Sequence, residues 1–358
     1  MKNHYIIPIF VPHKGCPHSC VFCNQKEITG QMDDVDDVFV EREIAKYLNT
    51  IPKSASTIEL SFFGGSFTGI PIDEMISLLK PAKRALDEGK IDAIRLSTRP
   101  DYIDDFILQT LKKYGASIIE LGVQSMDEEV LSKSRRGHSV EDVYRASSLI
   151  KEYGFRLGLQ MMVGLPGDDF KKDIHTADEF IKINPEMVRI YPSLVIKNTM
   201  MEQMYKKGEY KPLSVDEAVE ICTSLYLKFV ANDINVIRMG LQPTENINLG
   251  KDVISGPFHP SFRELVESVL MNDMILYSYK KLGSASMDIF INPKSISKLY
   301  ADKKRYFNEM LNMIEKPKVK VKAEEGMPYD TITIHTDDGS LNMSIKDYSN
   351  IVCKKRNF

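Results

Sequence analysis

Short apolar runs alternate with longer amphipathic stretches through the first two thirds of this chain. Each run is at most eight residues long, which suits a buried strand and is too short for a buried helix. Apolar residues recur at helical spacing over 71–86, 102–114 and 140–153. Ser139, followed three residues later by Asp142, is a typical helix start. The predicted strands are 6–12, 57–63, 91–98, 117–123, 156–163 and 187–191.

Strand alternating with helix predicts βαβ units around a parallel sheet. Six such units favour an α/β fold built as a partial TIM-like (β/α)6 barrel, and an open Rossmann-like sheet is the alternative. We expect this barrel to span residues 1–245. In either architecture, ligands bind at the carboxyl ends of the strands.

The composition changes after about residue 245, and we expect a small accessory region over 246–358. Segment 279–322 holds eleven Lys or Arg residues and four acidic ones, a net charge of +7 in a chain whose formal charge is −3. Alternating residues near the C-terminus indicate a hairpin built from 318–322 and 331–334, with a turn at 337–339.

Distinctive motifs follow each of the first four predicted strands. Three cysteines come after the first strand and Gly64-Gly65-Ser66 after the second, while segments 98–101 and 124–125 follow the third and fourth. The carboxyl ends of parallel strands meet at one rim of the sheet. Because unrelated motifs would not all fall at the same rim, we expect them to form one site.

The cysteines Cys16, Cys20 and Cys23 have the spacing C-x3-C-x2-C. The chain has five cysteines in total, an odd number that fits a reducing compartment. Thiolates are the preferred ligands of iron–sulfur clusters, and three of them on a four-iron cluster would leave one iron open for a ligand. Zinc is the competing metal, with His13 or His18 as a fourth ligand.

This triplet, with the aromatic Phe22 just before its last cysteine, resembles the signature of the radical S-adenosylmethionine (SAM) superfamily. The resemblance implies that a [4Fe-4S] cluster held by the three cysteines binds SAM. Reduction of the cluster then cleaves SAM to a 5′-deoxyadenosyl radical, which abstracts hydrogen from a substrate. Cys16, Cys20 and Cys23 would therefore be the catalytic and metal-binding residues.

A narrower resemblance covers about residues 5–245. Six motifs, in order, are similar to the catalytic subunit of Elongator, an enzyme that modifies wobble uridines in tRNA with a radical SAM domain fused to an acetyltransferase-like domain. A looser similarity to oxygen-independent coproporphyrinogen oxidases runs through part of the same region. We expect the chain to lack the acetyltransferase-like domain, because it ends about 110 residues after the barrel. The six motifs are 63–67, 97–102, 122–125, 136–138, 194–199 and 236–238.

The resemblance also implies contacts to SAM at the strand ends. Glycines without Cβ atoms let backbone approach a ligand closely, and a guanidinium suits the SAM carboxylate. Ser66 replaces the family's common glutamate, and Gln160 replaces an acidic SAM ligand of related oxidases. A solvated basic turn is the alternative for Arg136. The predicted cofactor-binding residues are Phe22, Gly64, Gly65, Ser66, Ser97, Gln124, Arg136 and Gln160.

The leading hypothesis is a radical SAM enzyme that acts on RNA, with a tRNA base as substrate and an electron donor of the flavodoxin or ferredoxin type. The basic segment interleaves lysines with Tyr279, Tyr300, Tyr306 and Phe307, which suits phosphate contact and base stacking; a solvated helix face is the alternative. Two other functions stay open. One is a radical SAM enzyme for a small molecule such as a porphyrin precursor, and the other is a non-catalytic iron–sulfur or RNA-binding module.

The chain has no apolar run of the roughly 18 residues that a membrane helix needs. Its N-terminal apolar stretch is interrupted by prolines and is followed by no small-residue cleavage site. We therefore expect a cytoplasmic protein with no membrane partner.

Overall fold

The computed structural model forms two compact units. The residues that the structure describes are 3–11, 16, 19–24, 35–241, 247–283, 286–314 and 318–356. The first unit spans Met1–Leu213 and Leu241–Phe258, and the second spans Ser214–Gly240 and His259–Phe358.

This division differs from the predicted boundary near residue 245. The helix α9 (Val215–Ala231) belongs to the second unit because it packs against α10 (Phe262–Leu282) and α13 (Ile345–Arg356). The chain therefore passes from one unit to the other three times. The assignment of separate roles to the barrel and the accessory region stays a prediction.

Six strands of the first unit pair in chain order, and every pair is parallel. This order is that of a (β/α) barrel, whereas the strand order of a Rossmann-like sheet reverses at its middle. The predicted partial TIM-like α/β fold is confirmed. The strands are β1 (His4–Val11), β2 (Thr57–Gly64), β3 (Ala93–Thr98), β4 (Ala116–Gln124), β5 (Arg156–Val163) and β6 (Met187–Pro192), and β8 (Asn235–Met239) follows β6 in the sheet order.

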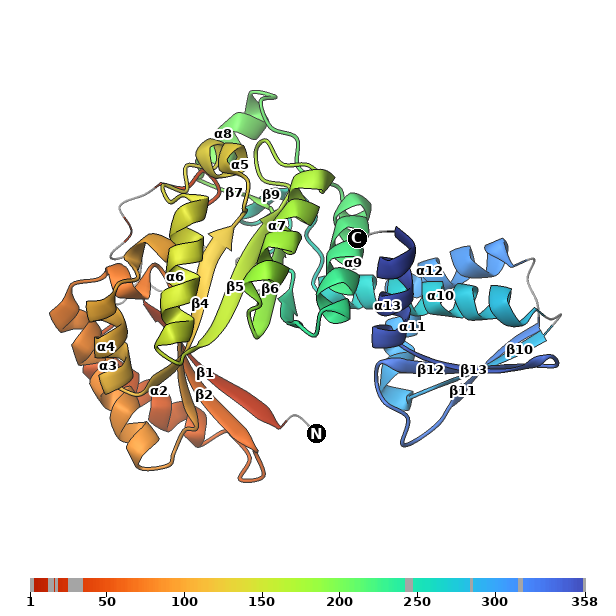
Figure 1. The fold of residues 1–358 in the computed structure, drawn as a ribbon, viewed down its shortest axis with the longest axis horizontal. Coiled ribbons are helices and arrows are strands. Elements are labelled where there is room, and N and C mark those ends of the chain that lie inside the picture. The colour runs from red at the N-terminus through yellow and green to blue at the C-terminus, as the bar shows by residue number, and fades with distance from the viewer. Residues whose placement is uncertain are drawn as a thin grey trace. The chain divides into compact units, whose positions relative to one another are not determined.

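Helices cover one face of this sheet (Figure 1). The strand side chains that face them are apolar and fully buried, such as Ile9, Phe62 and Leu121. Alternate residues point to the other face, which is the interior of the partial barrel. The elements outside the sheet are α2 (Asp37–Leu48), η1 (Phe67–Gly69), α3 (Ile72–Asp87), η2 (Pro100–Tyr102), α4 (Asp105–Lys113), α5 (Glu128–Lys133), α6 (Val140–Glu152), α7 (Phe170–Ile183), α8 (Met200–Lys206) and the antiparallel pair β7 (Val195–Ile196) and β9 (Val253–Ser255).

Side-chain caps set where the helices begin. The predicted start of α6 is confirmed, because Ser139 and Asp142 form a capping box. The helix α4 begins later than the predicted stretch 102–114. Asp104 caps it by accepting a hydrogen bond from the backbone N–H of Ile107 at 2.8 Å, and the preceding residues form η2.

The second unit packs helices on a four-stranded sheet with the order β11-β10-β12-β13. Its buried core includes Met274, Ile289 and Ile334. Among the described residues, no helix is both long and apolar enough to cross a membrane. The remaining elements are β10 (Ser286–Ile291), η3 (Pro293–Ser295), α11 (Ile296–Leu299), α12 (Ala301–Met313), β11 (Lys318–Ala323), β12 (Thr331–Thr336) and β13 (Gly339–Ser344).

The terminal hairpin is confirmed only in part. The strands β12 and β13 pair antiparallel around the predicted turn. The expected pairing of 318–322 with 331–334 is wrong, because β11 instead pairs parallel with β10 at the edge of the sheet. The helices α11 and α12 lie between these two strands in the chain, and such a crossover is what a parallel pair requires.

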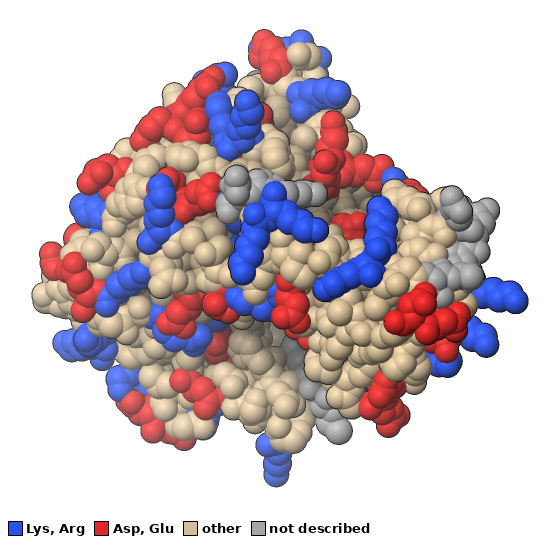
Figure 2. Space-filling view, turned by 45° about the vertical axis from the view of Figure 1, so that its right-hand side comes forward, with Lys and Arg blue, Asp and Glu red and all other residues tan. Residues whose placement is uncertain are grey.

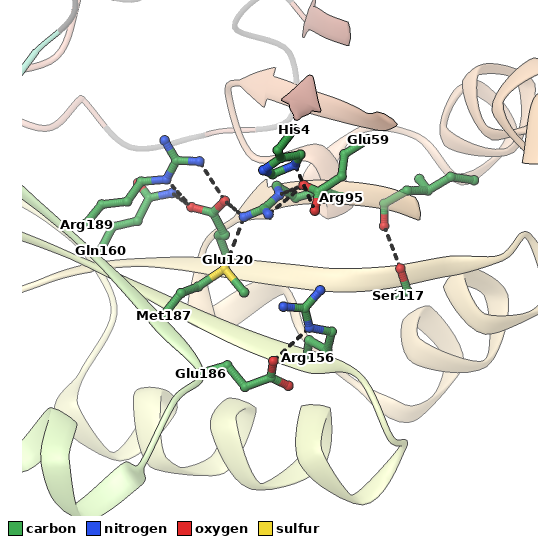
Figure 3. Close-up of polar contacts among 11 residues, drawn as sticks. His4, Glu59, Arg95, Ser117, Glu120, Arg156, Gln160, Glu186, Met187 and Arg189 are labelled. Carbon is green, nitrogen blue, oxygen red and sulfur yellow. Dashed lines mark hydrogen bonds and ion pairs between the residues drawn. The ribbon is translucent and has the colours of Figure 1, made fainter. Parts of the chain in front are cut away.

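A network of buried charges lies inside the partial barrel (Figure 3). Arg95 of β3 donates from Nε and Nη2 to Glu59 of β2, at 2.8 and 2.6 Å, and from Nη1 to Oε1 of Glu120 of β4 at 2.6 Å. Arg189 of β6 donates from Nη2 to the same Oε1 at 2.8 Å. Burial alone would raise the pKa of Glu120, but Arg189 and Arg95 hold it below its usual value. The network therefore keeps a charged carboxylate in the barrel interior.

A glycine lets this network reach across the strand β5. A Cβ atom at Gly158 would lie 2.8 Å from Cγ of Glu120, closer than side chains pack. The missing side chain leaves the space through which Arg189 on one side of β5 meets Glu120 on the other. The sequence pattern does not predict this network, because these strands have the pattern of apolar runs.

The substitution Glu120→Gln tests the network, since it keeps the shape and removes the charge shared by two guanidinium groups. We expect the free energy of unfolding in urea to fall by about 3–5 kcal/mol, because two cations stay buried with too few partners. The control is Glu186→Gln, which removes the partner of Arg156 from a pair whose side chains are 53% and 49% exposed. Its loss should be about 0.5 kcal/mol or less. Equal losses for the two variants would contradict the argument.

Candidate functional site

One pocket lies at the carboxyl ends of the strands β1 to β5. All eleven site residues predicted from the sequence line it, so the structure brings the cysteines and the strand-end motifs together as expected. Three further lining residues, Thr98, Arg99 and Gly122, were not among the predicted ones. The full lining is Cys16, Cys20, Phe22, Cys23, Gly64, Gly65, Ser66, Ser97, Thr98, Arg99, Gly122, Gln124, Arg136 and Gln160.

A glycine at the end of β2 lets the loops after β1 and β2 meet. Gly64 has a φ of +113°, and a Cβ atom there would lie 2.2 Å from the carbonyl oxygen of Val11. No other residue fits at this distance from backbone. The N–H of Gly65 also donates to the Val11 carbonyl. The Gly64–Ser66 loop is therefore held beside the chain that leads to the cysteines.

Backbone hydrogen bonds hold the cysteine segment. The N–H of Val21 donates to the carbonyl of Ser134 at 3.1 Å, and the carbonyl of Val21 accepts from the N–H of Met201 at 2.8 Å. The N–H of Cys23 donates to the carbonyl of Cys20 at 3.0 Å, which closes a tight turn. This turn directs both cysteines toward the pocket they line.

The structure describes Cys16 but not residues 12–15, 17–18 and 25–34 around the triplet. The candidate zinc ligands His13 and His18 fall outside the described residues. Within the part of the chain that the structure describes, no three His, Cys, Asp or Glu side chains are close enough together to hold a metal ion. The metal assignment of the triplet stays a prediction.

Arg136 lies between a cysteine and a strand end. Its Nη1 donates to Sγ of Cys20 at 3.3 Å, its Nη2 donates to the carbonyl oxygen of Gly122, and its guanidinium lies 6.0 Å from the ring centre of Phe22. Arg136 is only 6% exposed. The alternative interpretation as a solvated basic turn is therefore wrong for this residue, although the neighbouring Arg135 is exposed.

Arg99 places a second guanidinium in the pocket. Its Nε and Nη2 donate to Asp101 at 2.9 and 2.8 Å, and the residue is 4% exposed. Burial alone would lower the pKa of Arg99, but the Asp101 carboxylate, together with Cys16 and Cys20, keeps it above its usual value. Its place in the strand-end motif 98–101 was the signal that could have added it to the predicted site.

Four buried polar atoms in the pocket have no hydrogen-bond partner among the described residues. They comprise guanidinium N–H groups, a hydroxyl and an amide oxygen, so they offer both donors and acceptors. Leaving such a group buried and unpaired costs about 1–3 kcal/mol. The pocket is therefore suited to a small ligand that carries a carboxylate and hydrogen-bonding groups. The atoms are Oγ of Ser66, Nη1 of Arg99, Oε1 of Gln124 and Nε of Arg136.

The backbone of Gln124 supports this interpretation. Its φ is +76°, a left-handed conformation that is uncommon for a residue with a side chain and that clusters at functional sites. The conformation accompanies an irregularity in the pairing of β4 with β5. The ladder skips Val123 and resumes with Gln124 opposite Met161, and such an irregularity re-aims a side chain, here that of Gln124, which lines the pocket.

Gln160 links the pocket to the charge network. Its Nε2 donates to Oε2 of Glu120 at 3.1 Å and to Oγ of Ser97 at 3.4 Å. Figure 3 shows Gln160 beside Arg189 and Glu120 in the barrel interior. The position of Gln160 is thus coupled to the buried ion pairs below the pocket.

Comparison with known proteins independently supports the resemblance to the radical SAM superfamily. Residues 10–180 match the family described as the radical SAM superfamily, and residues 185–272 match the radical SAM C-terminal domain. The chain is similar to the tRNA uridine(34) acetyltransferase of Methanocaldococcus jannaschii, with 29% identity over 255 residues that cover 60% of this chain and 47% of that protein. It is also 29% identical to human Elongator complex protein 3 over 208 residues, which cover 52% of this chain and 38% of that protein.

A solved structure of a related protein has a similar fold. The archaeal Elp3 of Methanocaldococcus infernus, with an N-terminal deletion, superposes with a TM-score of 0.61 at 25% identity, covering 76% of this chain and 64% of that chain. The chain spans about half or less of the length of the two relatives named above. From the matched families, this fold and the gathered strand-end motifs, we conclude that the chain belongs to the radical SAM superfamily.

Proposed function

We propose that this protein is a radical SAM enzyme that cleaves SAM reductively at a [4Fe-4S] cluster and modifies a base in tRNA. The observation that carries the proposal is that one pocket is lined by the three cysteines and by the residues whose buried polar atoms have no partner among the described residues. Cys16, Cys20 and Cys23 would hold the cluster. Once bound, the cluster and SAM would supply one-electron reduction and a 5′-deoxyadenosyl radical.

Different residues of the pocket suit different chemical groups of SAM. The unpartnered N–H groups of Arg136 and Arg99 are the cations available to the carboxylate. The hydroxyl of Ser66 and the backbone beside it suit the amino group. Oε1 of Gln124 is an acceptor without a partner among the described residues, which suits a ribose hydroxyl. A reductant of the flavodoxin or ferredoxin type would supply the electron.

The names of the relatives support a tRNA substrate. One is a tRNA uridine(34) acetyltransferase, and this chain covers 47% of its length. The proposal therefore concerns the radical step on a tRNA base and does not extend to acetyl transfer. Its runner-up is the same radical chemistry on a small molecule.

The cysteine assignment predicts the metal content of the anaerobically reconstituted protein. We expect about four iron and four sulfide per chain, as a [4Fe-4S] cluster requires, and formation of 5′-deoxyadenosine from SAM with dithionite. The triple variant Cys16→Ala/Cys20→Ala/Cys23→Ala should lose both. Cys353→Ala, a partly buried cysteine on α13, should keep both. A colourless wild-type protein with one zinc would contradict the proposal.

The position of Arg136 in the pocket leads to a prediction about the affinity for SAM. Arg136→Ala should weaken SAM binding to the reconstituted protein by about 10- to 150-fold, because hydrogen bonds to charged groups contribute about 1.5–3 kcal/mol. Equilibrium dialysis measures the dissociation constant, and iron analysis checks that the cluster is retained. Arg135→Ala, the exposed neighbour, is the matched control and should bind SAM as the wild type does. A similar loss in both variants would argue against a direct contact.

The substrate assignment predicts that tRNA stimulates the reaction. Unmodified tRNA should increase the rate of 5′-deoxyadenosine formation, and mass spectrometry of the digested tRNA should find a changed nucleoside. A panel containing porphyrin precursors and other metabolites should leave the rate unchanged. Stimulation by one of these small molecules, with none by tRNA, would instead favour the runner-up.

A further inference from the structure

The four-stranded sheet of the second unit lies beyond the family matches, which end at residue 272. The helices α10 and α13 pack against this sheet and cover one of its faces (Figure 1). The apolar side chains directed at them are almost completely buried. These are Met287, Ile289, Ile291, Ile332, Ile334 and Met343.

The opposite face carries polar, basic and aromatic side chains. Strand side chains alternate between faces, so the neighbours of the buried residues point away from the helices. Lys318, Lys320, Lys322 and His335 are exposed, and Phe290 is partly exposed. No described helix of this unit packs on this face (Figure 1).

An aromatic pair lies at the centre of this face. Phe290 of β10 and His335 of β12 have ring centres 4.8 Å apart. Nζ of Lys322 lies 5.1 Å from the ring centre of Phe290 and also forms an ion pair with Asp288 at 2.6 Å. A partly exposed ring flanked by a cation can stack a flat, electron-rich group such as a nucleobase.

Positive charge runs along one edge of the same face. The three lysines of β11 stand opposite Ser286, Asp288 and Phe290 of β10. Lys318 and Lys320 make no ion pair with a described residue. Asp288 is the one acidic neighbour of these lysines on β10, and further acidic residues lie at the ends of the strands, at 324–325 and 337–338. This edge is therefore complementary to a chain of phosphates.

Charge elsewhere is mixed. In Figure 2, Lys and Arg side chains are interspersed with Asp and Glu over the face that is drawn, which agrees with the net charge of −3. Two aromatic residues of the basic segment 279–322 also differ from the expectation. Tyr300 and Phe307 pack against each other with ring centres 5.0 Å apart, and Phe307 is only 8% exposed. Phe307 is thus less accessible than the partly exposed Phe290.

We propose that this sheet face binds a single-stranded segment of RNA, with a base stacked on Phe290 beside His335, whose ring is tilted by 53° from that of Phe290, and with phosphates along Lys318 and Lys320. A sheet face with aromatic side chains at its centre and lysines at its edge provides stacking and phosphate contact together. Lysines on an edge strand also protect it from pairing with other chains, but that role requires no aromatic pair on the same face. The identification of the RNA as tRNA rests on the proposed function.

Fluorescence anisotropy tests this inference, with the full-length protein, unmodified tRNA and a single-stranded RNA oligonucleotide as probes. Phe290→Leu removes the ring and keeps an apolar side chain; it should weaken binding by about 5- to 150-fold, the range for loss of one stacked base. Lys318→Glu/Lys320→Glu should weaken binding and reduce the slope of log affinity against log salt by about 1.4, as expected for two contacts to single-stranded phosphates.

The matched control is Lys280→Glu/Lys281→Glu, which makes the same charge change at two exposed lysines on α10. It should change the affinity less than about threefold, and circular dichroism should report the same fold for every variant. Wild-type affinity in both sheet variants would overturn the inference, and so would an equal loss in the control. The inference would also be overturned if the Phe290→Leu variant kept the wild-type affinity for RNA and the wild type bound polyglutamate tightly. That result would indicate an acidic protein partner.

The outcomes separate this inference from the proposed function. Iron content and 5′-deoxyadenosine formation without RNA do not depend on the sheet face, so the sheet variants should retain both. If wild-type tRNA stimulation persists undiminished in the sheet variants, only the sheet-face inference fails. If the wild type cleaves SAM but binds neither RNA probe, both this inference and the tRNA part of the proposed function fail, while the radical chemistry stands.

Discussion

The pocket depends on the buried ion pairs inside the partial barrel. Backbone hydrogen bonds join each strand only to its neighbours, but Arg189 of β6 reaches Glu120 of β4 across the gap left by Gly158 on β5. Arg95 extends the network to β2. These contacts couple strands that are not adjacent, and such coupling restricts how far one strand can slide against another. Since the loops that line the pocket start at the ends of these strands, their relative positions follow from the network.

The chemistry of the pocket depends on buried polar atoms that have no hydrogen-bond partner among the described residues. A cysteine triplet by itself suits iron or zinc, and Gly64 by itself indicates only a tight turn. The combination is more specific, because one nitrogen of each of two buried guanidinium groups, a hydroxyl and an amide oxygen have no partner among the described residues, in side chains that line the pocket with the thiols. Such groups are costly to bury unless a ligand completes their hydrogen bonds. This cost is the physical argument for a polar cofactor next to the cysteines.

Much of the fold and site could be predicted because the signals are local. The strands β1 to β6 appear as short apolar runs, and Ser139 caps α6 within one turn of chain. The predicted site residues gather because parallel strands place their carboxyl ends at one rim. Where the prediction failed, the strand or residue that decided the structure was distant in the sequence. Lys318–Ala323 alternates as a hairpin strand would, yet it pairs with β10 across the helices between them, and Phe307, expected to stack on bases, is buried against Tyr300.

By itself, the sequence determined the order of strands and helices, the cap of α6 and the rim at which the site forms, since each depends on residues close together in the chain. Only the tertiary structure decided which charges are buried and which groups they meet. Glu120 and Arg189 are 69 residues apart, and Cys20 and Arg136 are 116 apart. Contacts of this kind depend on the register of strands and the close approach of loops, which no local pattern encodes.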